Sequence, residues 1–323
     1  MMRFMLKVVA AAVSAALSCA AMAQNFPVKP VRIVVPFPPG GGVDIVARVV
    51  GPKLAMQYGQ QVIVENRAGA AGIIGTEFTA RAAPDGYTWA IATLGNLAAN
   101  KHLYPKMAVD PLKDLAAVTQ VVDVHFVMVA HPSLPAKTVP QLIALAKARP
   151  GEITYASSGA GGAPHLGGEL FNRLAGVKIT HVPYKGSGPS FADLLGGHVS
   201  LTYDSMLQAL PYIRDKKLVA LGVLGGKRAA ALPDVPTIAE QGVKGYELTN
   251  WFGLVVPAAT PKDLITRIHG DFTKVLQEKE IRDKITGMGA DVVANSPEQF
   301  VTFWRNESEK WGRVIREANI RAE

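Results

Sequence analysis

The stretch VRIVVPFPPGGGVDIVARVV, from Val31 to Val50, decides the fold of this chain. Its β-branched start predicts a buried strand that stops at Pro36–Pro39. Three glycines follow, and the residues after Asp44 predict a helix. A strand, a glycine loop and a helix start bring free backbone N–H groups to one spot, which suits a carboxylate or a phosphate. We expect Asp44 to be the N-cap of this helix and to fix the loop rather than to contact the anion.

The N-terminus has the features of an export signal. Arg3 and Lys7 precede the apolar run Val8–Leu17, and Ala21-Met22-Ala23 matches a cleavage site. We therefore expect a signal peptide over residues 1–23, cleavage after Ala23 and a periplasmic protein. The apolar run is too short to span a membrane. Lipid attachment at Cys19 remains the alternative.

Composition narrows the possible chemistry. Cys19 is the only cysteine, so cleavage leaves none and excludes disulfides and Cys-based zinc sites. The chain has 34 Lys+Arg and 26 Asp+Glu, a net charge of +8, which falls to +6 without Arg3 and Lys7. No basic run is long enough to indicate a nucleic-acid partner, and we expect none. The mild positive field favours anionic ligands.

Strand and helix patterns alternate along most of the chain, which predicts an α/β fold. The expected strands are 31–35, 62–65, 88–93, 126–130, 153–156, 179–182, 199–203, 219–224 and 251–256. The expected helices include 44–58, 164–174, 190–195, one that follows the capping box at 138–141, one that Thr260 caps, and a last one that follows the capping box at 296–299.

Four loops rich in Gly, Ser, Asn or Thr each follow a predicted strand. In open α/β sheets, ligands bind beyond the carboxyl ends of strands, so we expect these loops to converge on one cleft. Ordinary tight turns are the alternative for any one of them. The loops are Pro36–Gly42, Thr93–Asn100, Ser157–Ala163 and Gly186–Pro189.

The loop Ser157–Ala163 is the second candidate anion site, because its hydroxyls and N–H groups precede a helix start. A carboxylate and a phosphate both fit. Neither glycine-rich loop matches G-x-x-x-x-G-K-[ST] or G-x-G-x-x-G, so we expect no nucleotide and no cofactor.

Candidate catalytic and metal-binding residues are few. His165 and Glu169 share a helix face, but HExxH is absent, so we expect no metal, and we expect His165 to fix its loop. No serine lies in G-x-S-x-G, and we expect no catalytic residues. Asp204 follows a predicted strand, where it could accept a hydrogen bond from a ligand amino or hydroxyl group or could serve a turn.

The mature chain resembles the Bug (TctC-like) solute-binding receptors of tripartite tricarboxylate transporters. The resemblance follows the signal peptide and runs in order along the chain. It is carried by PVRIVVPFPPGGGVDIVAR (30–48), VENRAGA (64–70), APDGYT (83–88), Ser158 to His165, VPYKG (182–186) and DLLGG (193–197).

The resemblance implies a two-lobed periplasmic binding protein fold (type II-like), in which each lobe is a mixed sheet flanked by helices. It places lobe one at 24–124 and 250–323 and lobe two at 125–249. It also implies a small carboxylate ligand, membrane permease subunits as partners and no enzymatic activity. We expect a monomer, because hinge closure needs no second chain.

The loops matching the family's binding loops supply most of the expected contacts. The second loop has Gly161-Gly162-Ala163 where relatives often have another serine, which argues against strong binding of a distal carboxylate. We expect ligand contacts from Phe37, Pro38, Pro39, Gly41, Gly42, Thr93, Asn96, Ser157, Ser158, Gly159, Ala163, Gly186 and Asp204. Tyr203 and Trp251, with Phe37, could form an apolar floor or pack in the core.

Two other functions remain open from the sequence. A periplasmic sensor would bind the same ligand and present it to a membrane signalling partner. An exported hydrolase would convert a carboxylated substrate rather than bind it reversibly. The identity of the acid is not encoded in any motif of the sequence.

Overall fold

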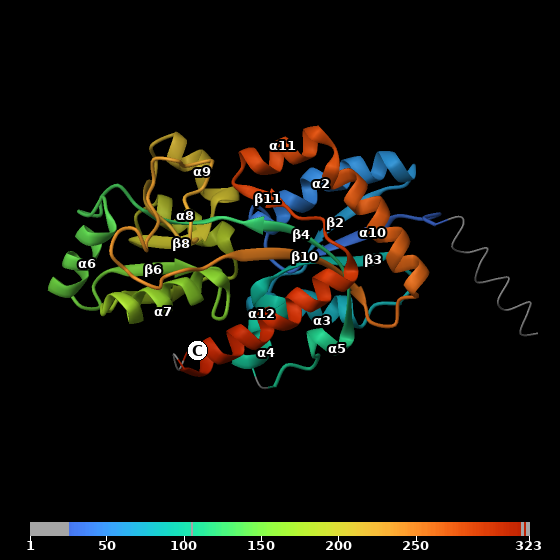
Figure 1. The fold of residues 1–323 in the computed structure, drawn as a ribbon, viewed down its shortest axis with the longest axis horizontal. Coiled ribbons are helices and arrows are strands. Elements are labelled where there is room, and N and C mark those ends of the chain that lie inside the picture. Colours follow the sequence, from blue (N-terminus) through green and yellow to red (C-terminus); the bar gives the residue numbers. More distant parts are fainter. Residues whose placement is uncertain (1–25, 105, 318–319, 321–323) are drawn as a thin grey trace, which may run out of the picture.

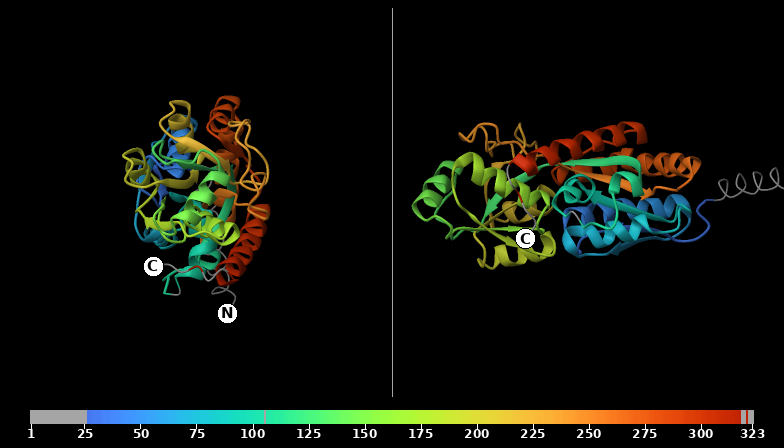
Figure 2. Two further views of the ribbon diagram at one scale, coloured as in Figure 1. Left: turned by 90° about the vertical axis from the view of Figure 1, so that its left-hand side faces the viewer. Right: turned by 90° about the horizontal axis from the view of Figure 1, so that it is seen from below.

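The computed structural model describes residues 26–104, 106–317 and 320. The expected signal peptide, its cleavage site and Cys19 lie outside these residues. The described strands form two sheets, each flanked by helices, which lie side by side along the long axis of the molecule (Figures 1 and 2). Both sheets contain parallel and antiparallel pairs. The predicted α/β, two-lobed architecture with a mixed sheet in each lobe is therefore confirmed.

The first sheet is built around the predicted opening strand. β1 (Val31–Val35) lies parallel to both its neighbours, and all its residues except Arg32 are buried. The spatial order is β11 (Ala290–Val292), β4 (Leu115–Val124), β10 (Asn250–Pro257), β3 (Thr88–Thr93), β1 and β2 (Val62–Asn66). Beyond β3, the strand β10 runs antiparallel to β3, and β4 runs antiparallel to β10. These two strands extend the sheet toward the second lobe.

The second sheet has β8 (Leu201–Ser205) near its centre, with every residue buried. β8 is parallel to one neighbour and antiparallel to the other, so the carboxyl ends of two strands meet at one edge. The spatial order is β7 (Thr180–Pro183), β6 (Thr154–Ser157), β8, β5 (Phe126–Ala130) and β9 (Val219–Val223).

Helices cover both faces of each sheet (Figure 1). In the first lobe, one face carries α2 (Gly42–Tyr58), α10 (Lys262–Gln277) and α11 (Lys279–Gly287), and the other carries α3 (Ile73–Ala80) and α12 (Pro297–Glu317). Short helical segments are η1 (Ala70–Gly72), η2 (Gly95–Ala99), α4 (Asn100–Leu103) and α5 (Pro111–Asp114). In the second lobe, α7 (Ala163–Ala175) lies opposite α8 (Ser187–Leu195) and α9 (Met206–Arg214), and α6 (Val139–Ala148) lies at the outer end.

The chain passes between the sheets at two places. β4 ends at Val124 and β5 begins at Phe126, so only His125 separates strands of different sheets. The return segment after β9 leads into β10, which begins at Asn250. Both passages lie beside each other because β4 and β10 are paired along their length.

The structure differs from the sequence predictions at two places in the first lobe. The predicted loop Thr93–Asn100 is mostly helical, because Leu94 and Leu97 pack into the core and hold η2 there. The strand β4 was not predicted, because Thr119, Gln120 and other polar residues interrupt its apolar pattern. Thr119 and Gln120 are both buried and both hydrogen-bond to Asn295. The Asn295 carbonyl oxygen accepts from the Thr119 hydroxyl (2.7 Å), and the Asn295 side-chain oxygen accepts from the Gln120 N–H (2.9 Å).

Helix starts were predicted with mixed success. The second capping box is confirmed, since Ser296 and Gln299 exchange two hydrogen bonds of 3.0 and 3.2 Å before α12. At Thr138 the hydroxyl accepts from the Gln141 N–H (3.4 Å), as a capping residue does. Thr260 is not an N-cap, because α10 is preceded by Pro261 and has no side-chain cap.

Gly253 in β10 provides a test of the core packing. A Cβ at this position would overlap the ring of Phe300, which is buried. We expect Gly253→Ala to lower the free energy of unfolding by about 1–3 kcal/mol. The control is Gly270→Ala in α10, where a Cβ meets nothing within 4 Å and alanine favours the helix. Thermal unfolding of both variants checks this, and equal melting temperatures would contradict it.

Candidate functional site

The first glycine loop is held by the side chain of Asp44. This carboxylate accepts hydrogen bonds from the Gly40 N–H (3.0 Å), from Arg48 Nε (2.9 Å) and from Asn66 Nδ2 (2.9 Å). Asn66 Nδ2 also donates to the Phe37 carbonyl (3.0 Å). Burial opposes ionisation of Asp44, but these hydrogen bonds outweigh it and lower the pKa of the carboxyl. The sequence analysis predicted Asp44 as the N-cap of α2, and this prediction is wrong, because the helix already begins at Gly42 and Gly41 is the N-cap.

The second glycine loop is held by the imidazoles of His165, which is buried, and His181, which is half-buried. His165 Nδ1 accepts from the Gly161 N–H (3.0 Å), and His181 Nε2 lies 2.6 Å from Ser157 Oγ. The two rings stack with centroids 4.4 Å apart. Burial lowers the pKa of His165 to about 4; burial, together with the neighbouring His165, lowers the pKa of His181 to about 3. Both rings are therefore neutral at neutral pH and support the loop as hydrogen-bond partners.

Asn96 supports the third loop from inside. Its Oδ1 accepts from the backbone N–H of Thr93 (3.2 Å) and from Thr93 Oγ1 (3.0 Å). Its Nδ2 donates to the Ala71 carbonyl (2.9 Å), which joins this segment to η1. Asn96 therefore orients Thr93 without facing the pocket itself.

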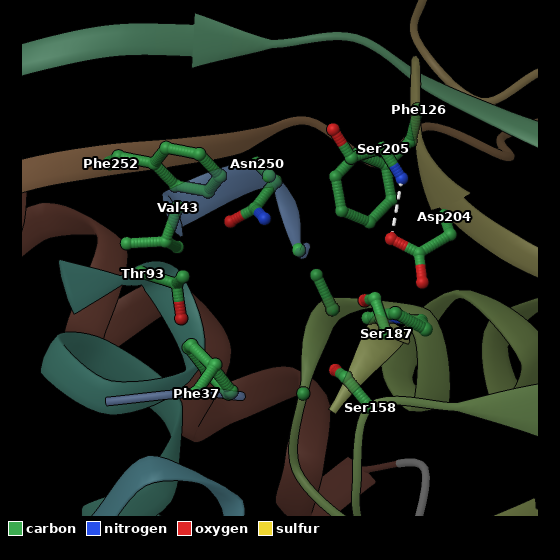
Figure 3. A pocket seen from close by; sticks show the side chains of 15 residues that line it. Phe37, Val43, Thr93, Phe126, Ser158, Ser187, Asp204, Ser205, Asn250 and Phe252 are labelled. Atoms are coloured by element: carbon green, nitrogen blue, oxygen red, sulfur yellow. Dashed lines mark hydrogen bonds between the residues drawn. The ribbon is translucent and has the colours of Figure 1, made fainter. Parts of the chain in front are cut away.

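A pocket lies between the two lobes, with a cavity volume of about 40 Å³ (Figure 3). All four predicted loops contribute to its lining. The expected residues that line it are Phe37, Gly41, Gly42, Thr93, Ser158, Ala163 and Asp204, whereas Pro38, Pro39, Asn96, Ser157, Gly159 and Gly186 do not. The lining residues that the sequence did not point out are Val43, Phe126, Gly162, Pro164, Ser187, Ser205, Asn250 and Phe252.

Most of the missed residues had an indirect signal. Ser187 belongs to the fourth predicted loop, and Gly162 and Pro164 adjoin the predicted Ala163. Phe126 and Asn250 each lie within two residues of a predicted lobe crossing, so the crossings themselves pointed to the pocket. Phe252 had no sequence signal.

Tyr203 and Trp251 belong to the core, not to the pocket floor. The ring of Tyr203 packs on Tyr155 and Phe171, with centroids 5.5 and 5.9 Å away. Trp251 packs on Phe300 and donates its indole N–H to Glu307 (3.2 Å).

Three helices begin at this pocket without a side-chain cap. The starts of α2 and α7 line it with their preceding glycine and first two residues, and the start of α8 lines it with Ser187. The first backbone N–H groups of a helix have no intrahelical partner, and the helix dipole adds partial positive charge there. The fourth adjoining helix, α9, is different, because Ser205 caps the Leu207 N–H (3.1 Å). The pocket is therefore rich in donors from the main chain.

Asp204 is the one ionisable side chain among the described lining residues. It lies inside β8 rather than after it, and is 2% exposed. Its Oδ1 accepts from the Ser205 N–H (2.6 Å), and its Oδ2 has no hydrogen-bond partner among the described residues. Burial raises the pKa of Asp204 to about 6, against smaller lowering effects of the Ser187 hydroxyl and the Ser205 N–H.

The two lobes touch around the pocket. Tyr104 Oη donates to the Ala160 carbonyl across the cleft (2.7 Å). A Cβ on Gly188 would lie 2.9 Å from the Pro39 carbonyl oxygen. A second cavity of about 210 Å³ adjoins the pocket, shares Phe37 and Ser158 with it, and is lined by Lys185. The two lobes are therefore closed on each other in this structure.

Two searches of the described residues were negative. No three His, Cys, Asp or Glu side chains within residues 26–104, 106–317 and 320 are grouped so as to hold a metal ion. In the same part of the chain, no helix combines the length and apolar character needed to cross a bilayer.

The raised pKa of Asp204 makes stability depend on pH. The ordinary value is 3.8, so the folded state holds this proton more tightly than the unfolded chain, and stability that is present below about pH 4 is lost as the pH rises to about 6. We expect Asp204→Asn to stabilise the fold at pH 8 by about 2 kcal/mol more than at pH 4. Denaturant unfolding at the two pH values checks this. A stability difference from the wild type that is constant with pH would contradict it.

The comparisons with known proteins agree with this architecture. The family model described as "Tripartite tricarboxylate transporter family receptor" (TctC) matches residues 46–320. Protein BugT of Bordetella pertussis is 38% identical over 309 residues, which are 95% of each chain.

Three solved structures are similar over nearly their whole length. They are an R. palustris protein with adipate (36% identical, TM-score 0.89, 92% of this chain and 99% of that one), the periplasmic binding protein BugD (32%, 0.88, 92% and 100%) and MatC from Rhodopseudomonas palustris with bound malate (31%, 0.86, 90% and 100%). The chain therefore belongs to the receptors of the tripartite tricarboxylate transporter family, and the predicted resemblance to Bug (TctC-like) solute-binding proteins is confirmed.

Proposed function

We propose that this protein binds a small carboxylate in the cleft between its lobes and delivers it to the permease of a tripartite tricarboxylate transporter. The observation that carries the proposal is the convergence of three uncapped helix starts on a pocket whose described lining has no Lys, Arg or His. Main-chain N–H groups at helix starts bind carboxylates without a charged side chain. The adipate and malate in two solved relatives are carboxylates and support the same ligand class.

The two lobes contribute different residues to the cleft. We infer that residues 24–124 and 250–323 form lobe one and that residues 125–249 form lobe two. Lobe one offers Gly41, Gly42 and Thr93 to the ligand, and lobe two offers Ser158, Ala163 and Ser187. Asp44, Asn96 and His165 act indirectly, because they hold loops and do not line the pocket.

Ligand entry requires the lobes to separate. The cavity of about 40 Å³ is far below the roughly 300–1,000 Å³ of small-molecule sites. A carboxylate of several carbons therefore enters an open form, which closes on it by a hinge motion at the two lobe crossings. The Tyr104–Ala160 hydrogen bond and the contact between Pro39 and Gly188 belong to the closed form.

We infer a receptor rather than an enzyme. The Ser157–His181 pair has a short contact of the kind that hydrolases use, but Ser157 is fully buried and does not line the pocket. The export motif at residues 1–23 supports a periplasmic receptor that is cleaved after Ala23. We infer that it acts as a monomer toward its permease, because hinge closure needs no second chain.

A binding screen tests the proposal. The chain from Gln24 is titrated calorimetrically with mono- and dicarboxylates, sugars and cationic amines, and each mixture is then checked for conversion by mass spectrometry. We expect at least one carboxylate to bind with one-to-one stoichiometry and to be recovered unchanged. Binding of sugars or cations alone, or formation of a product, would contradict the proposal.

Gly188 offers a test of closure. In Gly188→Ala the new Cβ would lie 2.9 Å from the Pro39 carbonyl oxygen of the other lobe, and a backbone atom gives way little. We expect carboxylate affinity to fall about tenfold or more, mostly through faster dissociation, while the melting temperature without ligand stays within a few degrees. Gly270→Ala, whose Cβ meets nothing within 4 Å, is the control and should bind normally. Unchanged affinity in Gly188→Ala would show that the closed contact is not part of the bound state.

A further inference from the structure

We propose that the ligand carries, beside its carboxylate, a hydroxyl or ammonium group that donates a hydrogen bond to Asp204 Oδ2. The inference rests on the proposed carboxylate-binding function and narrows its ligand class to hydroxy- or amino-carboxylates. Its basis is the contrast between one unpartnered carboxylate oxygen and the donors that make up the rest of the pocket.

The carboxyl group that carries this oxygen is held in a fixed position in the pocket. Asp204 lies in the central strand of lobe two, where its position is fixed by β-pairing and by the 2.6 Å bond from the Ser205 N–H to Oδ1. Its side chain points toward Ser187 in the pocket (Figure 3). Oδ2 is buried, and no donor among the described residues meets hydrogen-bond geometry with it, although the neighbouring Ser187 hydroxyl is close enough to lower the pKa of the carboxyl slightly. A buried acceptor without a donor is costly, so a ligand that brings a donor recovers that cost.

The other polar groups of the pocket offer donors. Asn250 Oδ1 accepts from the Trp251 N–H (2.9 Å), which leaves Nδ2 for a ligand acceptor. Ser205 Oγ accepts from the Leu207 N–H, which leaves its hydroxyl proton to donate. The starts of α2, α7 and α8 add main-chain N–H groups. A ligand carboxylate therefore has its partners in this set, and Asp204 needs a different part of the ligand.

The charge of the pocket lining also favours a ligand that carries a hydrogen-bond donor. Asp204 is the single ionisable group of the described lining, and Lys185 lines the adjoining cavity instead. An unsubstituted carboxylate would bring an anion to a pocket that already holds a carboxyl group and no cation. A hydroxyl or an ammonium next to the ligand carboxylate separates the two acidic groups with a donor that serves Asp204.

The test uses ligands with matched carbon skeletons. The protein from Gln24 is titrated at pH 8 with unsubstituted, 2-hydroxy and 2-amino members of one series, such as butanoate with its derivatives and succinate with malate and aspartate. We expect the hydroxy or the amino member to bind at least tenfold more tightly than its parent acid. The tighter of the two identifies the donor as hydroxyl or ammonium.

The variant that tests the contact is Asp204→Asn, which keeps the shape and replaces the free acceptor. We expect it to reduce the preference for the substituted acid to about threefold or less, while the parent acid binds as well as before or better. Asp215→Asn, at the far end of α9 and exposed, is the control and should keep the wild-type preference. Thermal unfolding shows whether each variant is folded. If a variant does not fold, the ligand series measured on the wild-type protein still tests the inference.

The outcomes separate this inference from the proposed function. If parent acids bind as tightly as their substituted partners, the inference is wrong and the carboxylate receptor stands. The same holds if Asp204→Asn keeps the full preference. If no carboxylate of any kind binds, both proposals are wrong.

Discussion

The site depends on where one buried carboxylate directs its hydrogen bonds. Asp44 bonds the loop before its helix, the Arg48 side chain one turn later and Asn66 on the neighbouring strand. These bonds fix the loop between β1 and α2 while leaving the first N–H groups of α2 without a side-chain acceptor. His165 does the corresponding work in the other lobe, where its neutral ring accepts from Gly161. The residues that hold the loops are thus different from the residues that line the pocket.

Much of this arrangement could be predicted from sequence because it is local. The β-branched run at Val31, the glycines before α2 and the serines before α7 each determine their own strand or loop. β4 could not be predicted, because the partners of its buried polar side chains lie far away in sequence, at Asn295. Phe252 was missed for the same reason: its place in the pocket follows from the pairing of β10 with β3 and β4.

Different properties follow from the fold that the relatives share and from the side chains that line the pocket. A fold shared at 31–38% identity with these relatives accounts for the two lobes. Ligand choice depends on the few side chains that add to this main-chain frame. The described side chains that line the pocket here are four hydroxyls, one amide, a single carboxyl group, three phenylalanines, a valine, an alanine and a proline, a set small enough for each member to be changed in turn.

The position of the lobe crossings has a mechanical consequence. Phe126 and Asn250, the first residues of β5 and β10, line the pocket at the same places where the chain passes between the sheets. A ligand in this pocket would therefore touch the hinge itself as well as the two faces that close on it. On the proposed closing motion, the bulk of the ligand would set how far the hinge folds, so the angle between the lobes would report ligand size. A membrane partner that contacts both lobes could distinguish cargoes by that angle without touching them.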